Sequence, residues 1–175
     1  MNTPLTLLSL LCLFVLTGCG ALRPADGGGG YGRNSRPPRG PRPDPTSAIR
    51  TDIVTHAQEL LGVSYKFGGN TPREGFDCSG FTRYLYQYAG LDLNRVSRDQ
   101  ARQGKLVRAE AARPGDLVFF RRPGKPVFHV SLVVAAGPGE LWVIHSTSSR
   151  GVIRENILAS SYWRSKIYQV RDVLG

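Results

Sequence analysis

A change of composition near residue 48 limits how much of this chain can fold. Residues 20–47 contain seven Gly and six Pro in 28 positions, including the runs GGGG and RPPRGPRPDP. Such a segment has too few apolar side chains to offset the entropy lost on folding, so we expect an extended tether. The folded part is therefore confined to residues 48–175, and these 128 residues are enough for one hydrophobic core.

The residues before the tether have the pattern of an export signal. Residues 5–16, LTLLSLLCLFVL, form an apolar run of twelve, shorter than the roughly 20 residues that a membrane-spanning helix needs. The sequence Leu16-Thr17-Gly18-Cys19 follows and resembles the bacterial lipobox, in which the signal is removed before an acylated cysteine. We expect a signal peptide over 1–18 and a lipidated Cys19 that opens the tether, 19–47. An uncleaved signal and a chance cysteine are the alternatives, and the basic residues usual in such a signal are missing.

The lipobox would place the protein in the bacterial cell envelope, held to a membrane by lipid. Gly20, and not Asp, follows Cys19, which is typical of lipoproteins sent to the outer membrane, where they face the periplasm. The net charge is +10, of which the tether carries +3 and the folded part +7. Export and the scattered arginines, which form no stripe interleaved with aromatic residues, argue against a nucleic-acid partner.

The folded part shows helical spacing first and strand-like patterns later. An order of helices followed by antiparallel strands predicts an α+β fold with a sheet of about five strands, not an alternating parallel sheet. Helices are predicted at residues 48–61, 78–89 and 97–104, and strands at 116–120, 128–135, 141–145, 151–154 and 167–173.

Cys78 is a candidate nucleophile. If Cys12 leaves with the signal and Cys19 is acylated, Cys78 has no disulfide partner. It falls in the first turn of a predicted helix behind Asp77, a residue suited to capping, and the N–H groups there favour a thiolate and lower the pKa of a thiol. A small buried hydrophobic residue is the alternative interpretation.

Two histidines are expected on one face of the predicted sheet. A hairpin centred on Gly137 would set His129 opposite His145, and a register shifted by two residues would also keep them on one face, because strand side chains alternate. One imidazole could then fix the tautomer of the other while its free nitrogen takes the proton from Cys78. Zinc binding by these three residues is the alternative, but no further Cys or acidic ligand is obviously placed.

These residues stand in motifs with a recognisable order: YKFGG at 65–69, GFDCSGF at 75–81, RPGDLVFF at 113–120, His129-Val130 and Ile144-His145-Ser146. Together they resemble the NlpC family of bacterial cell-wall cysteine peptidases over nearly all of residues 48–175. The resemblance implies a papain-like fold, with the catalytic cysteine at a helix start packed on an antiparallel sheet. It also implies no cofactor or metal, and a substrate among the peptide stems of peptidoglycan.

The resemblance assigns roles to single residues. Cys78 is the expected nucleophile, His129 the base and His145 the orienting residue, while Tyr65, Asp77 and Ser79 are expected to help bind substrate. Asp77 and Ser79 could instead serve only the start of the helix, and Tyr65 could only pack. Three basic residues near His129 could meet stem carboxylates, but a solvated turn is the preferred interpretation: Arg121, Arg122 and Lys125.

The leading hypothesis is a lipid-anchored peptidoglycan hydrolase that cleaves amide bonds in stem peptides or their cross-links. One alternative is a non-catalytic wall-binding module on the same fold, which would need none of Cys78, His129 and His145. The other is an acyl or amide transferase that uses the same nucleophile with an acceptor other than water. The sequence does not identify the bond cleaved or any regulatory partner protein.

Overall fold

The computed structural model describes residues 44–175. The predicted signal peptide 1–18, the lipidation site Cys19 and the tether up to residue 43 lie outside the described residues. Among the residues described, no helix combines the length and the hydropathy needed to cross a bilayer.

Two helices of several turns precede the sheet, as the sequence spacing predicts. They are α1 (Ser47–Glu59) and α2 (Cys78–Tyr88), and three short helical segments follow: α3 (Ser97–Gln100), the 3₁₀ turn η1 (Ala109–Ala111) and α4 (Ser161–Arg164). The segment at Ser97 is shorter than predicted. The amide of Gln100 is buried and donates hydrogen bonds to the carbonyls of Ser79 and Asn94.

The main sheet has six antiparallel strands in the order β3-β8-β4-β5-β6-β7, which confirms the α+β class and corrects the expected number of about five. The additional strand is β3, which pairs with β8 at the sheet edge. It has only three residues and two are exposed, so no alternating pattern marks it in the sequence. The strands are β3 (Lys105–Val107), β4 (Leu117–Arg121), β5 (Val127–Gly137), β6 (Glu140–Thr147), β7 (Gly151–Asn156) and β8 (Ile167–Asp172), and a separate small hairpin consists of β1 (Asn70–Thr71) and β2 (Gly75–Phe76).

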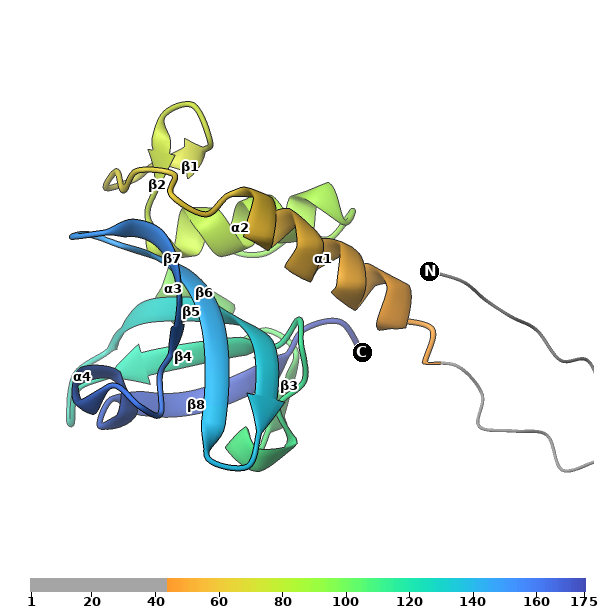
Figure 1. The fold of residues 1–175 in the computed structure, drawn as a ribbon, viewed down its shortest axis with the longest axis vertical. Coiled ribbons are helices and arrows are strands. Elements are labelled where there is room, and N and C mark those ends of the chain that lie inside the picture. Colours follow the sequence, from red (N-terminus) through yellow and green to blue (C-terminus); the bar gives the residue numbers. More distant parts are fainter. Residues whose placement is uncertain (1–43) are drawn as a thin grey trace, which may run out of the picture. The chain divides into compact units, whose positions relative to one another are not determined.

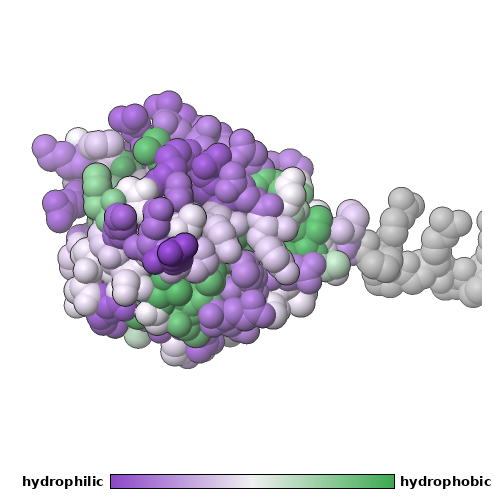
Figure 2. Space-filling view, turned by 90° about the horizontal axis from the view of Figure 1, so that it is seen from above, coloured by the Kyte–Doolittle hydropathy of each residue, from purple (hydrophilic) through white to green (hydrophobic). Residues whose placement is uncertain are grey.

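The sheet separates two hydrophobic clusters, and this explains the unbroken apolar run of β4. Leu117 and Phe119 enter the cluster beneath α1 and α2, whereas Val118 and Phe120 enter a second cluster that contains Trp163. Alternate side chains of a strand point to opposite faces, so a strand covered on both faces is apolar throughout. Figure 1 shows α1 and α2 together on one side of the sheet. The short helix α4 lies apart from them, next to the strands labelled β4 and β8. The surface seen from above is mainly hydrophilic (Figure 2).

The register between β5 and β6 places the two histidines. Leu132 faces Ile144 near the histidines, whereas Ala136 faces Leu141 near the turn, and the register shifts by one residue between Val133 and Ala135. His129 and His145 are therefore not directly opposite each other. The other expected register, shifted by two residues, holds near them and keeps both on one face. Without the irregularity at Val134, the register of the turn would continue and put the histidines on opposite faces of the sheet.

Candidate active site

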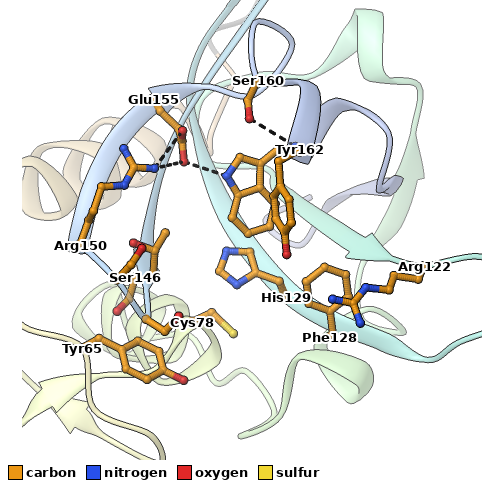
Figure 3. Close-up of a pocket in the computed structure, with 14 residues that line it drawn as sticks. Tyr65, Cys78, Arg122, Phe128, His129, Ser146, Arg150, Glu155, Ser160 and Tyr162 are labelled. Atoms are coloured by element: carbon orange, nitrogen blue, oxygen red, sulfur yellow. Dashed lines mark hydrogen bonds and ion pairs between the residues drawn. The ribbon is translucent and has the colours of Figure 1, made fainter.

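One cleft of about 520 Å³ contains three of the residues that the sequence singled out: Tyr65, Cys78 and His129. In Figure 3, Cys78 lies between Tyr65 and His129. His145 is fully buried behind this cleft. The other lining residues come mainly from the β6–β7 turn and from the segment around α4: Arg122, Phe128, Ser146, Thr147, Ser148, Ser149, Arg150, Glu155, Ser160, Tyr162 and Trp163.

Hydrogen bonds to residues before and after Cys78 hold the start of α2 in place. The Oδ1 atom of Asp77 accepts the N–H of Gly80 at 2.7 Å, so Asp77 is the N-cap that the sequence predicted. The hydroxyl of Ser146 on β6 donates to the carbonyl of Phe76 at 2.7 Å, which ties the residues before the helix to the sheet. Gly80 has no room for a side chain, because a Cβ atom there would lie 2.1 Å from the carbonyl oxygen of Gly69.

A chain of hydrogen bonds leads from His129 into the protein. Its Nε2 atom lies 2.8 Å from Nδ1 of His145, and Nε2 of His145 lies 2.7 Å from Oε1 of Glu155. Because a carboxylate only accepts, the proton on His145 sits on Nε2, which leaves its Nδ1 as an acceptor. His129 then donates from Nε2, and its Nδ1 is free to accept a proton from Cys78.

Glu155 is a residue of this site that sequence reasoning missed. Besides His145, its Oε1 atom accepts a hydrogen bond from Nε1 of Trp163 at 2.9 Å, and Arg150 lies 3.2 Å from both carboxylate oxygens. The hydrogen bond from His145, together with Arg150, holds the pKa of Glu155 below its usual value, although burial opposes this shift. Glu155 therefore contributes a fixed negative charge at the inner end of the chain.

Burial favours the neutral forms of the nucleophile and the base. It raises the pKa of the Cys78 thiol to about 11, although the N–H groups of Val130, Ser79 and Cys78 favour the thiolate. Burial, followed by the neighbouring His145, lowers the pKa of His129 well below 6.5. The expectation that the helix start lowers the pKa of the thiol is wrong, because the loss of water outweighs the N–H groups.

Asp77 and Ser79 are next to Cys78 in sequence but do not line the cleft. Arg95 binds both of them: its guanidinium contacts the two carboxylate oxygens of Asp77 at 3.0 and 2.8 Å and the hydroxyl of Ser79 at 3.1 Å. Burial raises the pKa of Asp77, but Arg95 and Gly80 more than offset that effect and hold it below its usual value. The two side chains are thus committed to shaping the start of α2. Tyr65 is the one member of the expected substrate-binding set that faces the cleft.

Trp163 packs against the base, His129. Its indole stacks on the imidazole of His129 at a centroid distance of 4.6 Å, and its N–H holds Glu155. One side chain therefore fixes the plane of the base and the position of the carboxylate.

Residues 62–172 match the NlpC/P60 family. The chain belongs to this family. The matched region contains Tyr65, Cys78, His129, His145 and Glu155, and it begins after α1.

Relatives in the NlpC/P60 family include hydrolases of different sizes. The chain is 43% identical over 124 residues to a gamma-DL-glutamyl hydrolase of Bacillus subtilis (strain 168), a match that covers 69% of this chain and 29% of the relative. It is 33% identical over 128 residues to the murein DD-endopeptidase MepS/murein LD-carboxypeptidase of Escherichia coli (strain K12), covering 73% of this chain and 64% of the relative. The chain thus spans less than two thirds of the length of each.

A solved structure of an NlpC/P60 family protein from Bacillus cereus ATCC 10987 has the same fold. Its TM-score is 0.64 at 31% identity, and the match covers 72% of this chain and 40% of that one. The α+β architecture and the family expected from the sequence motifs are thereby confirmed.

Proposed function

We propose that this protein hydrolyses amide bonds in peptidoglycan peptides, with the Cys78 thiol as nucleophile. The observation that carries the proposal is the chain of hydrogen bonds from His129 through His145 to Glu155, which ends in the cleft beside Cys78. Two relatives, the glutamyl hydrolase and the murein endopeptidase, are named for hydrolysis of peptide bonds, which supports the reaction class. A wall-binding module would have no use for a thiol next to an oriented base.

The reaction begins as the sulfur of Cys78 attacks the carbonyl carbon and Nδ1 of His129 takes the thiol proton. The tetrahedral intermediate collapses, its C–N bond breaks, and the imidazolium gives that proton to the departing amine. Water then attacks the thioester while His129 accepts its proton. The C–S bond breaks and the proton returns to sulfur, so the enzyme is restored. N–H groups in the first turn of α2 would stabilise the negative oxygen.

Glu155 and His145 support this cycle without contacting the substrate. When His129 becomes an imidazolium, its Nε2–H donates to His145, which in turn donates to the negative Glu155. The carboxylate lowers the free energy of the charged intermediate, and the hydrogen bonds fix the ring so that Nδ1 faces the sulfur. Both residues are positioning residues in this proposal.

The activity should persist to unusually high pH. Proton transfer needs a neutral His129, whose pKa lies well below 6.5, and a protonated Cys78, whose pKa is about 11. The value of kcat/KM should therefore fall only when acid protonates His129, and it should stay level from about pH 7 to about pH 10. Initial rates measured across this range test the prediction. A fall between pH 8 and 9 would mean that the active form is a thiolate and imidazolium pair.

The hydrolase proposal is tested with the full-length protein and purified peptidoglycan in ¹⁸O-labelled water. Mass spectrometry identifies the released muropeptides, and the Cys78→Ala variant is the control. We expect fragments that carry one ¹⁸O atom in a new carboxyl group and that are missing with the variant. Products joined to an added amine, without ¹⁸O, would instead indicate a transferase. Binding to the wall by both proteins without any product would indicate a binding module.

We also propose that Cys19 carries lipid and anchors the protein in the bacterial envelope, on the periplasmic side of an outer membrane. The apolar run and the lipobox-like residues before Cys19 support this proposal. Several acyl chains on one cysteine would bind a membrane far more firmly than one chain does. Labelled palmitate should enter the wild-type protein in cells and should not enter a Cys19→Ala variant. Equal labelling of the two proteins would refute the anchor.

A further inference from the structure

Arg122 carries a positive charge at the rim of the catalytic cleft, and no carboxylate in the described part of the chain, residues 44–175, neutralises it. Two arginines line this cleft, Arg122 and Arg150. Arg150 forms an ion pair with Glu155 at 3.2 Å, whereas no carboxylate of residues 44–175 lies within 4.0 Å of the Arg122 guanidinium. The guanidinium carbon of Arg122 lies 5.5 Å from the ring centre of Phe128, whose side chain also lines the cleft. Arg122 therefore has donors available to a ligand.

The position of Arg122 assigns it to one side of the reacting bond. His129 must reach the nitrogen of the departing amine to protonate it, and Phe128 precedes His129 on β5. The departing residue consequently faces the surface formed by Phe128 and Arg122. In Figure 3, Tyr65 lies on the opposite side of Cys78 and His129 from Arg122, next to the helix that carries the nucleophile. The acyl part of the substrate belongs on that side.

Resting on the proposed function, we propose that Arg122 binds a carboxylate on the departing, amine-bearing fragment of the substrate. The preferred substrates are then peptides in which the residue on the amine side of the reacting bond, or its close neighbour, has a free carboxylate. A guanidinium suits this task because it donates two parallel hydrogen bonds to one carboxylate and keeps its charge at every pH of interest. The sequence favoured a turn whose basic residues only face solvent. In this proposal one of them, Arg122, determines substrate specificity.

The neighbouring basic residues supply a matched control. The Arg121 guanidinium carbon lies 3.6 Å from the ring centre of Tyr168, and Arg121 and Lys125 line a different groove, of about 270 Å³. Arg121 has the same charge and is adjacent in sequence, but it does not line the catalytic cleft. An Arg121→Gln variant therefore removes the same charge from the adjacent position, at the end of β4, without touching the proposed carboxylate site.

The test compares soluble muropeptides with the same muropeptides after carbodiimide coupling of their carboxylates to ammonia, which gives neutral amides. Rates are measured for full-length wild-type, Arg122→Gln and Arg121→Gln proteins. We expect the Arg122→Gln variant to lose about 10-fold to 100-fold in kcat/KM on the acid form and little on the amide form. The Arg121→Gln variant should keep the wild-type preference for the acid form. Equal losses on both forms, or no loss, would overturn the proposal.

A binding measurement separates this proposal from the proposed reaction. Dissociation constants for the acid and amide forms are measured with the Cys78→Ala protein, alone and combined with Arg122→Gln. The Cys78→Ala protein should bind the acid form about tenfold or more tightly than the double variant does, and the two should bind the amide form alike. This result stands even if the wild-type protein hydrolyses nothing. If neither form binds, or if Arg122→Gln has no effect on the acid form, Arg122 is not a carboxylate-binding residue.

Discussion

Replacing Cys78 with alanine is expected to lower kcat for peptidoglycan cleavage by about 10⁴-fold to 10⁶-fold, the range seen when a catalytic nucleophile is removed. The reason is the geometry of the cleft, where Cys78 lies beside His129 and supplies the one thiol among the residues that line it. Quantitative mass spectrometry of muropeptides against time gives the two rates. A Cys78→Ala protein within tenfold of the wild type would refute the proposed nucleophile.

A serine at position 78 sharpens this prediction. Cys78→Ser keeps the size and the proton of the side chain, but the hydroxyl is a far weaker acid than the thiol, and His129 already has a pKa well below 6.5. The base is therefore too weak to activate serine, and we expect Cys78→Ser to be nearly as inactive as Cys78→Ala. Unchanged thermal unfolding of both variants would show that the fold is intact and that the loss concerns chemistry.

The second large effect is expected at the buried positioning residues. Replacing His145 with alanine removes the acceptor that fixes the His129 ring at 2.8 Å, and kcat should fall by about 10²-fold to 10⁴-fold. His145→Asn should recover part of this loss, because its amide oxygen can accept the hydrogen bond from His129. Steady-state kinetics on one muropeptide should show the loss in kcat with little change in KM. Unchanged kcat in His145→Ala would contradict the proposed role.

Glu155→Gln tests the charge at the end of the same chain. The amide keeps the size and the acceptor oxygen of Glu155 but loses the negative charge that favours an imidazolium. We expect kcat to fall by about 10-fold to 100-fold and the acid limb of the pH profile to move to lower pH, because His129 becomes harder to protonate. Arg150→Gln is the matched control. It removes an exposed partner of Glu155 at 3.2 Å and should change kcat less than tenfold.

The alternation of side chains along strands correctly predicted that His129 and His145 share a face, but it could not predict their register. The β5–β6 pairing near Gly137 has one register, and the pairing near the histidines has a register that differs by one residue. An irregularity at Val134 joins the two. Nothing in the apolar run around Val134 marks where the shift occurs. Packing of β5 against its neighbours determines the position of the irregularity, and packing is not a local property of the sequence.

Glu155 was missed because the predicted strand ended two residues too early, at Arg154. The strand β7 continues to Asn156, and its register sets Ile153 opposite His145 and Glu155 opposite Val143. Glu155 is thus two positions beyond the residue that faces His145, on the same face of the sheet. The pairing of facing residues that was used for the hairpin β5–β6, applied also to β6–β7, would have placed Glu155 near His145. The contact between Arg95 and Asp77 could not have been predicted in this way, because Arg95 comes from a loop that has no periodic pattern.

The expected acidity of Cys78 shows a limit of arguments from local sequence. The position at a helix start is correct, and the N–H groups that it supplies do favour the thiolate. Cys78 packs against a cluster that includes Val130 of β5 and Ile144 of β6, segments distant in sequence, and burial raises the pKa of its thiol to about 11. Local propensity thus identified the residue, whereas tertiary burial determined its protonation state.

The most direct test of the account is the intact mass of the protein, measured after rapid acid quenching during the first turnovers with a soluble muropeptide. We expect a transient species heavier than the enzyme by the acyl fragment of the substrate, with the thioester mapped to Cys78 by peptide fragmentation. Steady release of products without any such adduct, at a rate that the Cys78→Ala protein matches, would contradict it.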